Sequence, residues 1–85
     1  MRVGRASDND VVIDYPMAST HHMEIRKLSD GRIVIRDLMS SHGTFVNGQD
    51  IDLNVVELHH GDIVQIGDVT VSWEDYFMDE QNQSC

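Results

Sequence analysis

Turn signals recur every few residues along this chain, and they limit each regular segment to a short strand. The strongest signal is Asn47-Gly48, because both residues tolerate the positive φ that a two-residue hairpin turn needs. Gly67-Asp68 fits the related turn type that takes glycine first. Between the turns lie runs rich in Val and Ile, apolar and polar side chains alternate over residues 22–28, and no helical period is sustained. This pattern predicts an all-β fold, an antiparallel two-sheet β-sandwich.

The strands are expected mostly as hairpins. Residues 22–28 should pair with residues 32–36 across a turn, and residues 11–13 should form a short buried strand. In a sandwich the loops gather at the two ends, so loops that are far apart in sequence can share one end. We expect three loops to meet in this way, those at residues 5–10, 14–20 and 38–43.

Residues 52–60 are the stretch whose structure the pattern leaves open. Leu53, Val56 and Leu58 could be buried there. A single loose turn is as consistent with their spacing as a helix.

Composition narrows the classes of protein to which the chain can belong. Its 85 residues suffice for one domain, expected at residues 1–76 with a polar, flexible tail at residues 77–85. All six Lys and Arg residues precede residue 37 and the net charge is −9, so no nucleic-acid partner is expected. No apolar run approaches the ~18 residues of a membrane span, and the one cysteine, Cys85, allows no internal disulfide. We therefore expect a cytoplasmic domain that does not bind or span a membrane.

Six short motifs stand in order along the chain, and together they resemble the signature of forkhead-associated (FHA) domains over residues 3–76. The motifs are Gly4-Arg5, Asn9-Asp10, Ser19-Thr20-His21-His22, Asp37-Leu38, the run from Ser40 to Gly48, and Gly61-Asp62. The resemblance implies a two-sheet sandwich whose loops at one end bind phosphothreonine peptides. It also implies a non-catalytic module for phosphorylation-dependent protein–protein interaction, with a threonine-phosphorylated protein or peptide as its partner.

The resemblance assigns the phosphopeptide contacts to residues of those loops. A phosphothreonine carries about −1.5 to −2 charges and three acceptor oxygens. By resemblance, Arg5 binds the phosphate, where its planar guanidinium can bond two of the oxygens. Ser19 and Ser41 would donate hydroxyl hydrogen bonds to the phosphate, while Thr20 and His42 would supply further contacts to the peptide.

Other residues are implied as structural support of the site, namely Gly4, His22, Gly43 and Asn47. Two of the contact positions depart from the family pattern. Thr20 carries no charge, and His42 stands where the family usually has asparagine, whose amide offers a donor and an acceptor in one plane. These departures leave open a phosphorylation-independent interaction or self-association module of the same fold.

A hydrolase is a remote alternative. Asp37, Ser41 and His42 contain the residue types of a catalytic triad. Because Ser41 and His42 are neighbours on one loop, an in-line hydrogen bond between their side chains is disfavoured. We therefore expect neither an enzyme nor a cofactor.

Metal binding is also not expected. The histidine pairs His21-His22 and His59-His60 are the only obvious candidates in the sequence. Adjacent strand residues point to opposite faces, so neither pair readily chelates one ion.

The beginning of the chain predicts an uncovered sheet edge. FHA domains usually have strands ahead of the Gly-Arg motif, whereas three residues precede Gly4 here. The strand left uncovered is expected at residues 69–73, and an open edge presents unpaired N–H and C=O groups to another chain. The sequence therefore predicts that the chain is either poorly stable as a monomer or forms a homo-oligomer through this edge.

Overall fold

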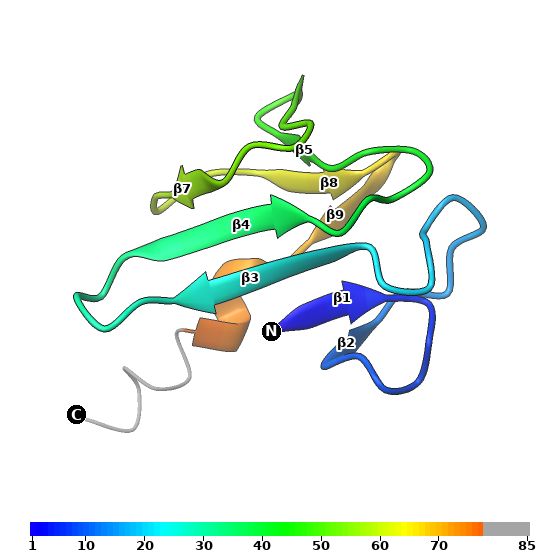
Figure 1. The fold of residues 1–85 in the computed structure, drawn as a ribbon, viewed down its shortest axis with the longest axis horizontal. Coiled ribbons are helices and arrows are strands. Elements are labelled where there is room, and N and C mark those ends of the chain that lie inside the picture. The colour runs from blue at the N-terminus through cyan, green and yellow to red at the C-terminus, as the bar shows by residue number, and fades with distance from the viewer. Residues whose placement is uncertain (78–85) are drawn as a thin grey trace.

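The computed structural model describes residues 1–77, which form a sandwich of two β-sheets (Figure 1). One sheet has the strand order β2-β1-β3-β4-β7 and the other β6-β5-β8-β9. The strands are β1 (Arg2–Gly4), β2 (Val11–Val12), β3 (Met23–Lys27), β4 (Ile33–Asp37), β5 (Phe45–Val46), β6 (Gln49–Asp50), β7 (Val56–Leu58), β8 (Val64–Ile66) and β9 (Val69–Val71). The predicted all-β sandwich is confirmed. Within this part of the chain the pairs are antiparallel, except that β1 runs parallel to β2.

The β3–β4 hairpin forms the centre of the larger sheet, as the alternation of its residues predicts. Ile25 lies opposite Ile35, and both side chains are fully buried. Gly31 closes the turn with a φ of 93°, in a region that L side chains rarely adopt. Because residues alternate between faces, Glu24 and Arg36 pair on the other side of the sheet, where their side chains form an ion pair at 3.0 Å.

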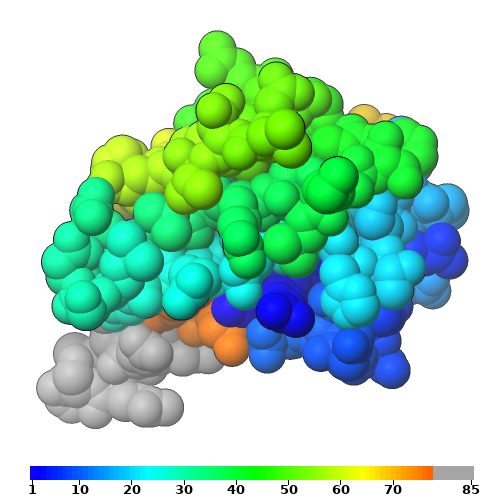
Figure 2. Space-filling view, viewed as in Figure 1, coloured from blue at the N-terminus to red at the C-terminus, as the bar shows by residue number. Residues whose placement is uncertain are grey.

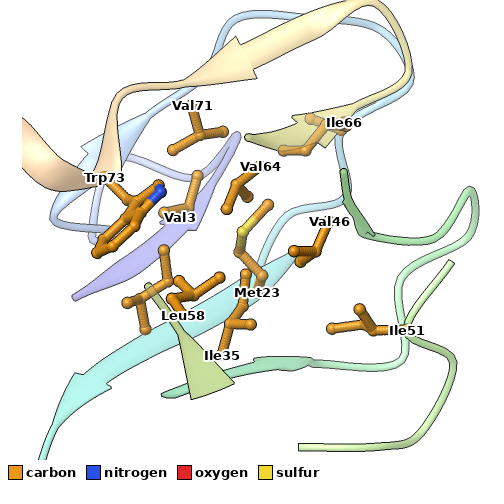
Figure 3. Packing of buried hydrophobic residues seen from close by; sticks show 12 residues of the cluster. Val3, Met23, Ile35, Val46, Ile51, Leu58, Val64, Ile66, Val71 and Trp73 are labelled. Carbon is orange, nitrogen blue, oxygen red and sulfur yellow. The ribbon is translucent and has the colours of Figure 1, made fainter. Parts of the chain in front are cut away.

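The core fills the space between the two sheets with aliphatic side chains from both (Figure 3). The larger sheet contributes Val3, Met23, Ile25, Ile35 and Leu58, and the smaller sheet contributes Val46, Val64, Ile66 and Val71. Trp73 closes the core after β9. Its ring is buried, and its Nε1–H donates to the Asp62 carbonyl oxygen at 2.9 Å, which satisfies the one polar atom of the side chain.

The strand at β2 differs from the expectation of a buried strand over residues 11–13. It is the outermost strand of its sheet and covers only Val11 and Val12. The Val12 side chain is 51% exposed. The prediction of burial was therefore wrong for Val12, whereas Val11 and Ile13 are partly buried and pack against the core, because an edge strand with one neighbour leaves part of its surface in solvent.

Residues 52–60 contain strand β7, which neither of the two expected structures includes. β7 pairs with β4, and Leu58 lies opposite Ile33 and is buried. Leu53 is 83% exposed, so its expected burial was wrong. A three-residue strand has too few positions to show a period, and its partner lies more than twenty residues away in sequence.

The two hairpin turns predicted from Asn47-Gly48 and Gly67-Asp68 are both present. Asn47 and Gly48 have φ values of 53° and 82° between β5 and β6. Gly67 has a φ of 57° at the start of the turn between β8 and β9. These turns set the register of the smaller sheet.

The C-terminal end of the described chain is a short helical turn at residues 73–77, which the sequence pattern did not predict. The expected tail lies almost entirely outside the described residues. None of the described helical structure has the length and apolar character that crossing a bilayer requires.

Three loops emerge at the same end of the sandwich, on the right in Figure 1. They follow β1, precede β3 and follow β4, and they are the three loops expected to meet. The β3–β4 turn lies at the opposite end.

Candidate functional site

The three loops enclose an open pocket of about 480 Å³. All five residues predicted to contact a ligand line it, namely Arg5, Ser19, Thr20, Ser41 and His42. Ala6, Pro16, Met17 and Ala18 complete the lining. The fold thus brings together residues separated by up to 37 positions in the sequence.

Arg5 supplies the positive charge of the pocket. It follows β1 directly, and its backbone N–H donates to the Ser19 carbonyl oxygen at 3.0 Å, which fixes the position from which the side chain extends. Among residues 1–77, no ion pair or hydrogen bond engages its exposed guanidinium. By contrast, Arg2 and Arg36 both bond Glu24. The Arg5 guanidinium is therefore available to an anion.

Ser19 and Ser41 are joined across the pocket. The backbone N–H of Ser41 donates to Ser19 Oγ at 3.0 Å. Because the Ser19 oxygen is the acceptor in this bond, its hydroxyl proton remains available for donation to another group. The bond also ties the loop before β3 to the loop after β4.

His22 connects the same two loops from inside the protein. The Ser19 backbone N–H donates to Nδ1 at 3.0 Å, and Nε2 lies 2.7 Å from the Gly43 carbonyl oxygen. Because Nδ1 accepts, these partners assign the proton of the neutral ring to Nε2, which donates to that carbonyl. The side chain is fully buried, so both bonds are shielded from water. His22 contributes no pocket surface and instead holds the loops in register.

Asp37 organises the loop after β4. Its Oδ1 accepts from the hydroxyls of Ser40 and Thr44, and its Oδ2 accepts from the Ser40 backbone N–H at 2.8 Å. Burial alone would raise the pKa of Asp37, but these hydrogen bonds outweigh it and hold the pKa below its ordinary value. The Ser40 hydroxyl oxygen in turn accepts from the Gly43 backbone N–H at 3.0 Å. The sequence analysis included Asp37 in the Asp37-Leu38 motif but did not predict that its carboxylate organises this loop.

The same bonds count against the triad considered for Asp37, Ser41 and His42. In the described chain the Asp37 carboxylate bonds Ser40 and Thr44, and no hydrogen bond joins it to His42 or joins His42 to Ser41. The side chains therefore do not form the relay that a hydrolase needs.

Gly4 allows the loop before β3 to approach β1 closely. A Cβ at this position would lie 2.3 Å from the Thr20 carbonyl oxygen. The same oxygen accepts from Asn9 Nδ2 at 2.8 Å, and Asn9 also bonds the Ala6 carbonyl oxygen at 2.8 Å. Asn9 is buried and was not among the predicted site residues, although it belongs to the Asn9-Asp10 motif. The available signal was the Asn9-Asp10 motif, which directly precedes the apolar run at residues 11–13.

Asn47 lies away from the pocket, at the other end of β5 from the loop that follows β4. Its Nδ2 donates to Asp62 Oδ1, and its Oδ1 accepts from the Ile63 N–H, both at 3.0 Å. These bonds hold the β5–β6 turn against the beginning of β8. Asn47 does not contact the pocket residues, so it can support the pocket only indirectly, by holding the smaller sheet in place.

Comparison with known proteins agrees with this architecture. A model of the FHA domain matches residues 1–67. The chain belongs to the FHA domain family. The ABC transporter ATP-binding/permease protein Rv1747 of Mycobacterium tuberculosis is 44% identical over 75 residues, which are 88% of this chain and 8% of that protein. The resemblance seen in the motifs is thereby confirmed, and the chain corresponds to a small part of this relative.

Solved structures show the same fold. M. tuberculosis EmbR, in complex with a low-affinity phosphopeptide, is 39% identical with a TM-score of 0.74, over 81% of this chain and 18% of that one. The FHA-2 domain of Rv1747 is 46% identical with a TM-score of 0.69, over 82% of this chain and 62% of that one.

Acid should loosen the loop after β4 through Asp37. Because folding lowers the pKa of this carboxyl, its ionised form contributes stability that is complete above about pH 4 and is lost as the pH falls through the folded-state value. We expect the urea-unfolding free energy of the wild type to fall more steeply between about pH 5 and pH 2 than that of Asp37→Asn. The other carboxyl groups are common to both proteins, so parallel pH profiles would contradict this role.

The substitution Gly4→Ala should destabilise the domain, because the added methyl group would overlap the Thr20 carbonyl group. Overpacking against backbone costs about 1–3 kcal/mol or more in the free energy of unfolding, measurable by urea denaturation. Gly31→Ala is the control, since nothing lies within 4 Å of its Cβ position and only backbone strain is added. A Gly4→Ala variant as stable as the wild type would show that the close approach at Gly4 is unimportant.

Proposed function

We propose that the pocket binds the phosphate group of a phosphothreonine peptide, and that the domain thereby mediates phosphorylation-dependent protein–protein interaction. The observation that carries the proposal is the convergence of Arg5, Ser19 and Ser41 from three separate loops on one open pocket. The guanidinium there has no partner within residues 1–77. A positioned cation with adjacent hydroxyl donors matches the charge and the acceptor oxygens of a phosphate.

Each residue then has a distinct role. Arg5 donates two N–H bonds to phosphate oxygens, and the Ser19 hydroxyl donates a third, with its oxygen already held by the Ser41 N–H. The Ser41 hydroxyl, Thr20 and His42 line the remaining wall and contact the phosphate or the peptide next to it. The EmbR structure, which contains a phosphopeptide on a related fold, supports this reading.

The test is calorimetric titration with a phosphothreonine peptide selected from an oriented peptide library. We expect Arg5→Ala to weaken binding by about one to two decades, because hydrogen bonds to charged groups contribute about 1.5–3 kcal/mol. Arg5→Lys should recover only part of the affinity, since an ammonium group lacks the planar fork. Arg26→Ala is the matched control, because Arg26 is likewise exposed but lies on β3 outside the pocket.

Phosphoserine and unmodified versions of the same peptide complete the experiment. Equal affinity for the phosphorylated and unmodified peptides would favour the phosphorylation-independent alternative. Equal affinity of the wild type and Arg5→Ala would show that the phosphate binds elsewhere.

Self-association is a second candidate function, favoured by the open edge of β9. In the described chain β9 pairs with β8 alone, and it is the last strand of its sheet. Its other edge can accept a strand from a second copy. The net charge of −9 opposes this pairing, and salt reduces the repulsion.

Light scattering at low and high salt measures this association. We expect dimers that increase with salt and that Thr70→Lys weakens, because an exposed lysine on an edge strand opposes pairing. Ser29→Lys adds the same charge at the exposed β3–β4 turn and serves as the control. A monodisperse monomer at both salt concentrations would rule out association through this edge.

A further inference from the structure

A second hollow of about 400 Å³ adjoins the phosphate pocket. Ser41 and His42 line both hollows, so only the width of one loop separates them. The rest of its rim comes from the segments after β4 and β6, which lie within the green surface in Figure 2. The additional lining residues are Asp37, Met39, Ser40, Gly43, Asp50, Asp52 and Leu53.

Two large apolar side chains on this rim face solvent. Met39 is 86% exposed and Leu53 is 83% exposed, the highest values among the exposed large apolar residues of the described chain. Met39 has a φ of 59°, which is uncommon for a residue with its side chain. The bonds of neighbouring Ser40 to Asp37 hold the turn that displays it. The fold therefore presents Met39 and Leu53 outward instead of packing them into the core.

Two carboxylates accompany these apolar side chains. Asp50 and Asp52 are exposed, and neither forms an ion pair within the described residues. Asp50 Oδ1 accepts from the Asp52 backbone N–H at 2.9 Å. Its Oδ2 lies 3.1 Å from the position a Cβ would take on Gly43, so the carboxylate packs against the residue next to His42. Negative charge thus borders the loop that lines the phosphate pocket.

We propose that this second hollow binds a lysine or arginine side chain of the same phosphothreonine peptide. The inference rests on the proposed function and deepens it, because it defines the class of peptide. The aliphatic stem of the basic residue lies between Met39 and Leu53, and its cationic head faces Asp50 and Asp52. The phosphate of the peptide then lies at Arg5 and its basic side chain lies at Asp50 and Asp52, so the charges of the peptide are complementary to those of the domain.

Peptide geometry is compatible with this arrangement. An extended peptide advances about 3.3 Å per residue, so a few residues suffice to cross the loop that separates the hollows. A peptide rich in acidic residues on that side would meet Asp50 and Asp52 directly. The domain's net charge of −9 adds to that repulsion at low salt.

The experiment is a lysine scan of a phosphothreonine peptide with alanine at the other positions, followed by calorimetry. We expect lysine or arginine at positions a few residues to one side of the phosphothreonine to raise affinity about tenfold over alanine. Glutamate there should lower affinity by a similar factor. The gain from lysine should decrease with salt.

Charge-removing variants locate the effect. Asp52→Asn is compatible with the backbone, because Asp52 has a φ of 53° and asparagine tolerates this conformation. We expect Asp52→Asn, and more fully Asp50→Asn combined with it, to abolish the preference for lysine while retaining affinity for the alanine peptide. Asp75→Asn removes the same charge from an exposed residue that does not line the second hollow, and should leave the preference intact.

The possible outcomes distinguish a failure of this inference from a failure of the proposed phosphothreonine-peptide binding. If the alanine phosphopeptide binds no better than its unmodified form, both the proposed function and this inference fail. If it binds in a phosphate-dependent manner but shows no preference among lysine, alanine and glutamate, this inference alone is overturned. This inference is also overturned if the Asp50→Asn, Asp52→Asn double variant prefers lysine over alanine as strongly as the Asp75→Asn control does.

Discussion

The buried imidazole of His22 bonds two loops at once, and the geometry of the pocket depends on it. One ring nitrogen accepts from the Ser19 backbone and the other donates to the Gly43 carbonyl oxygen. A side chain with a single polar atom could satisfy only one of these groups. It would leave the other buried without a partner, at a cost of about 1–3 kcal/mol. His22 does not line the pocket, yet its two hydrogen bonds fix the distance between Ser19 and the loop that contains Ser41.

The pocket is cationic within an acidic domain because Arg5 is the one Asp, Glu, Lys or Arg residue among those that line it. Glu24 bonds Arg2 and Arg36 on the outer face of the larger sheet. Asp37 directly precedes the loop that follows β4, but its oxygens accept from Ser40 and Thr44. Arg5 has no such neighbour among the described residues. A single unpaired guanidinium can thus dominate the local field although the chain as a whole is strongly negative.

Much of the fold could be predicted from local sequence chemistry. Alternation identified β3 and β4, and the Asn47-Gly48 pair identified its hairpin, because in both cases the determining residues are neighbours in sequence. The parallel β1–β2 pair joins strands of two and three residues, which are too short to show a period. The three-residue β7 is equally short, and its partner β4 lies more than twenty residues away. The pocket residues were predicted from family resemblance, since spacing alone cannot place Arg5 beside Ser41. The roles of Asn9 and Asp37 appeared only with their hydrogen-bond partners, because a polar residue in a loop has many potential partners in the sequence.

The pocket has a consequence for the lifetime of the domain, because its walls come from residues 5, 19–20 and 41–42. No single loop contains the site, and the unfolded chain has no preformed place for a phosphate. A ligand that binds only the native state stabilises it by RT ln(1 + [L]/Kd), about 2.7 kcal/mol at a hundredfold excess over Kd. The unfolded fraction, which is the form that proteases cut, then falls about a hundredfold. Under the proposed function, a kinase acting on the partner would in this way also prolong the survival of the domain that binds the phosphorylated product.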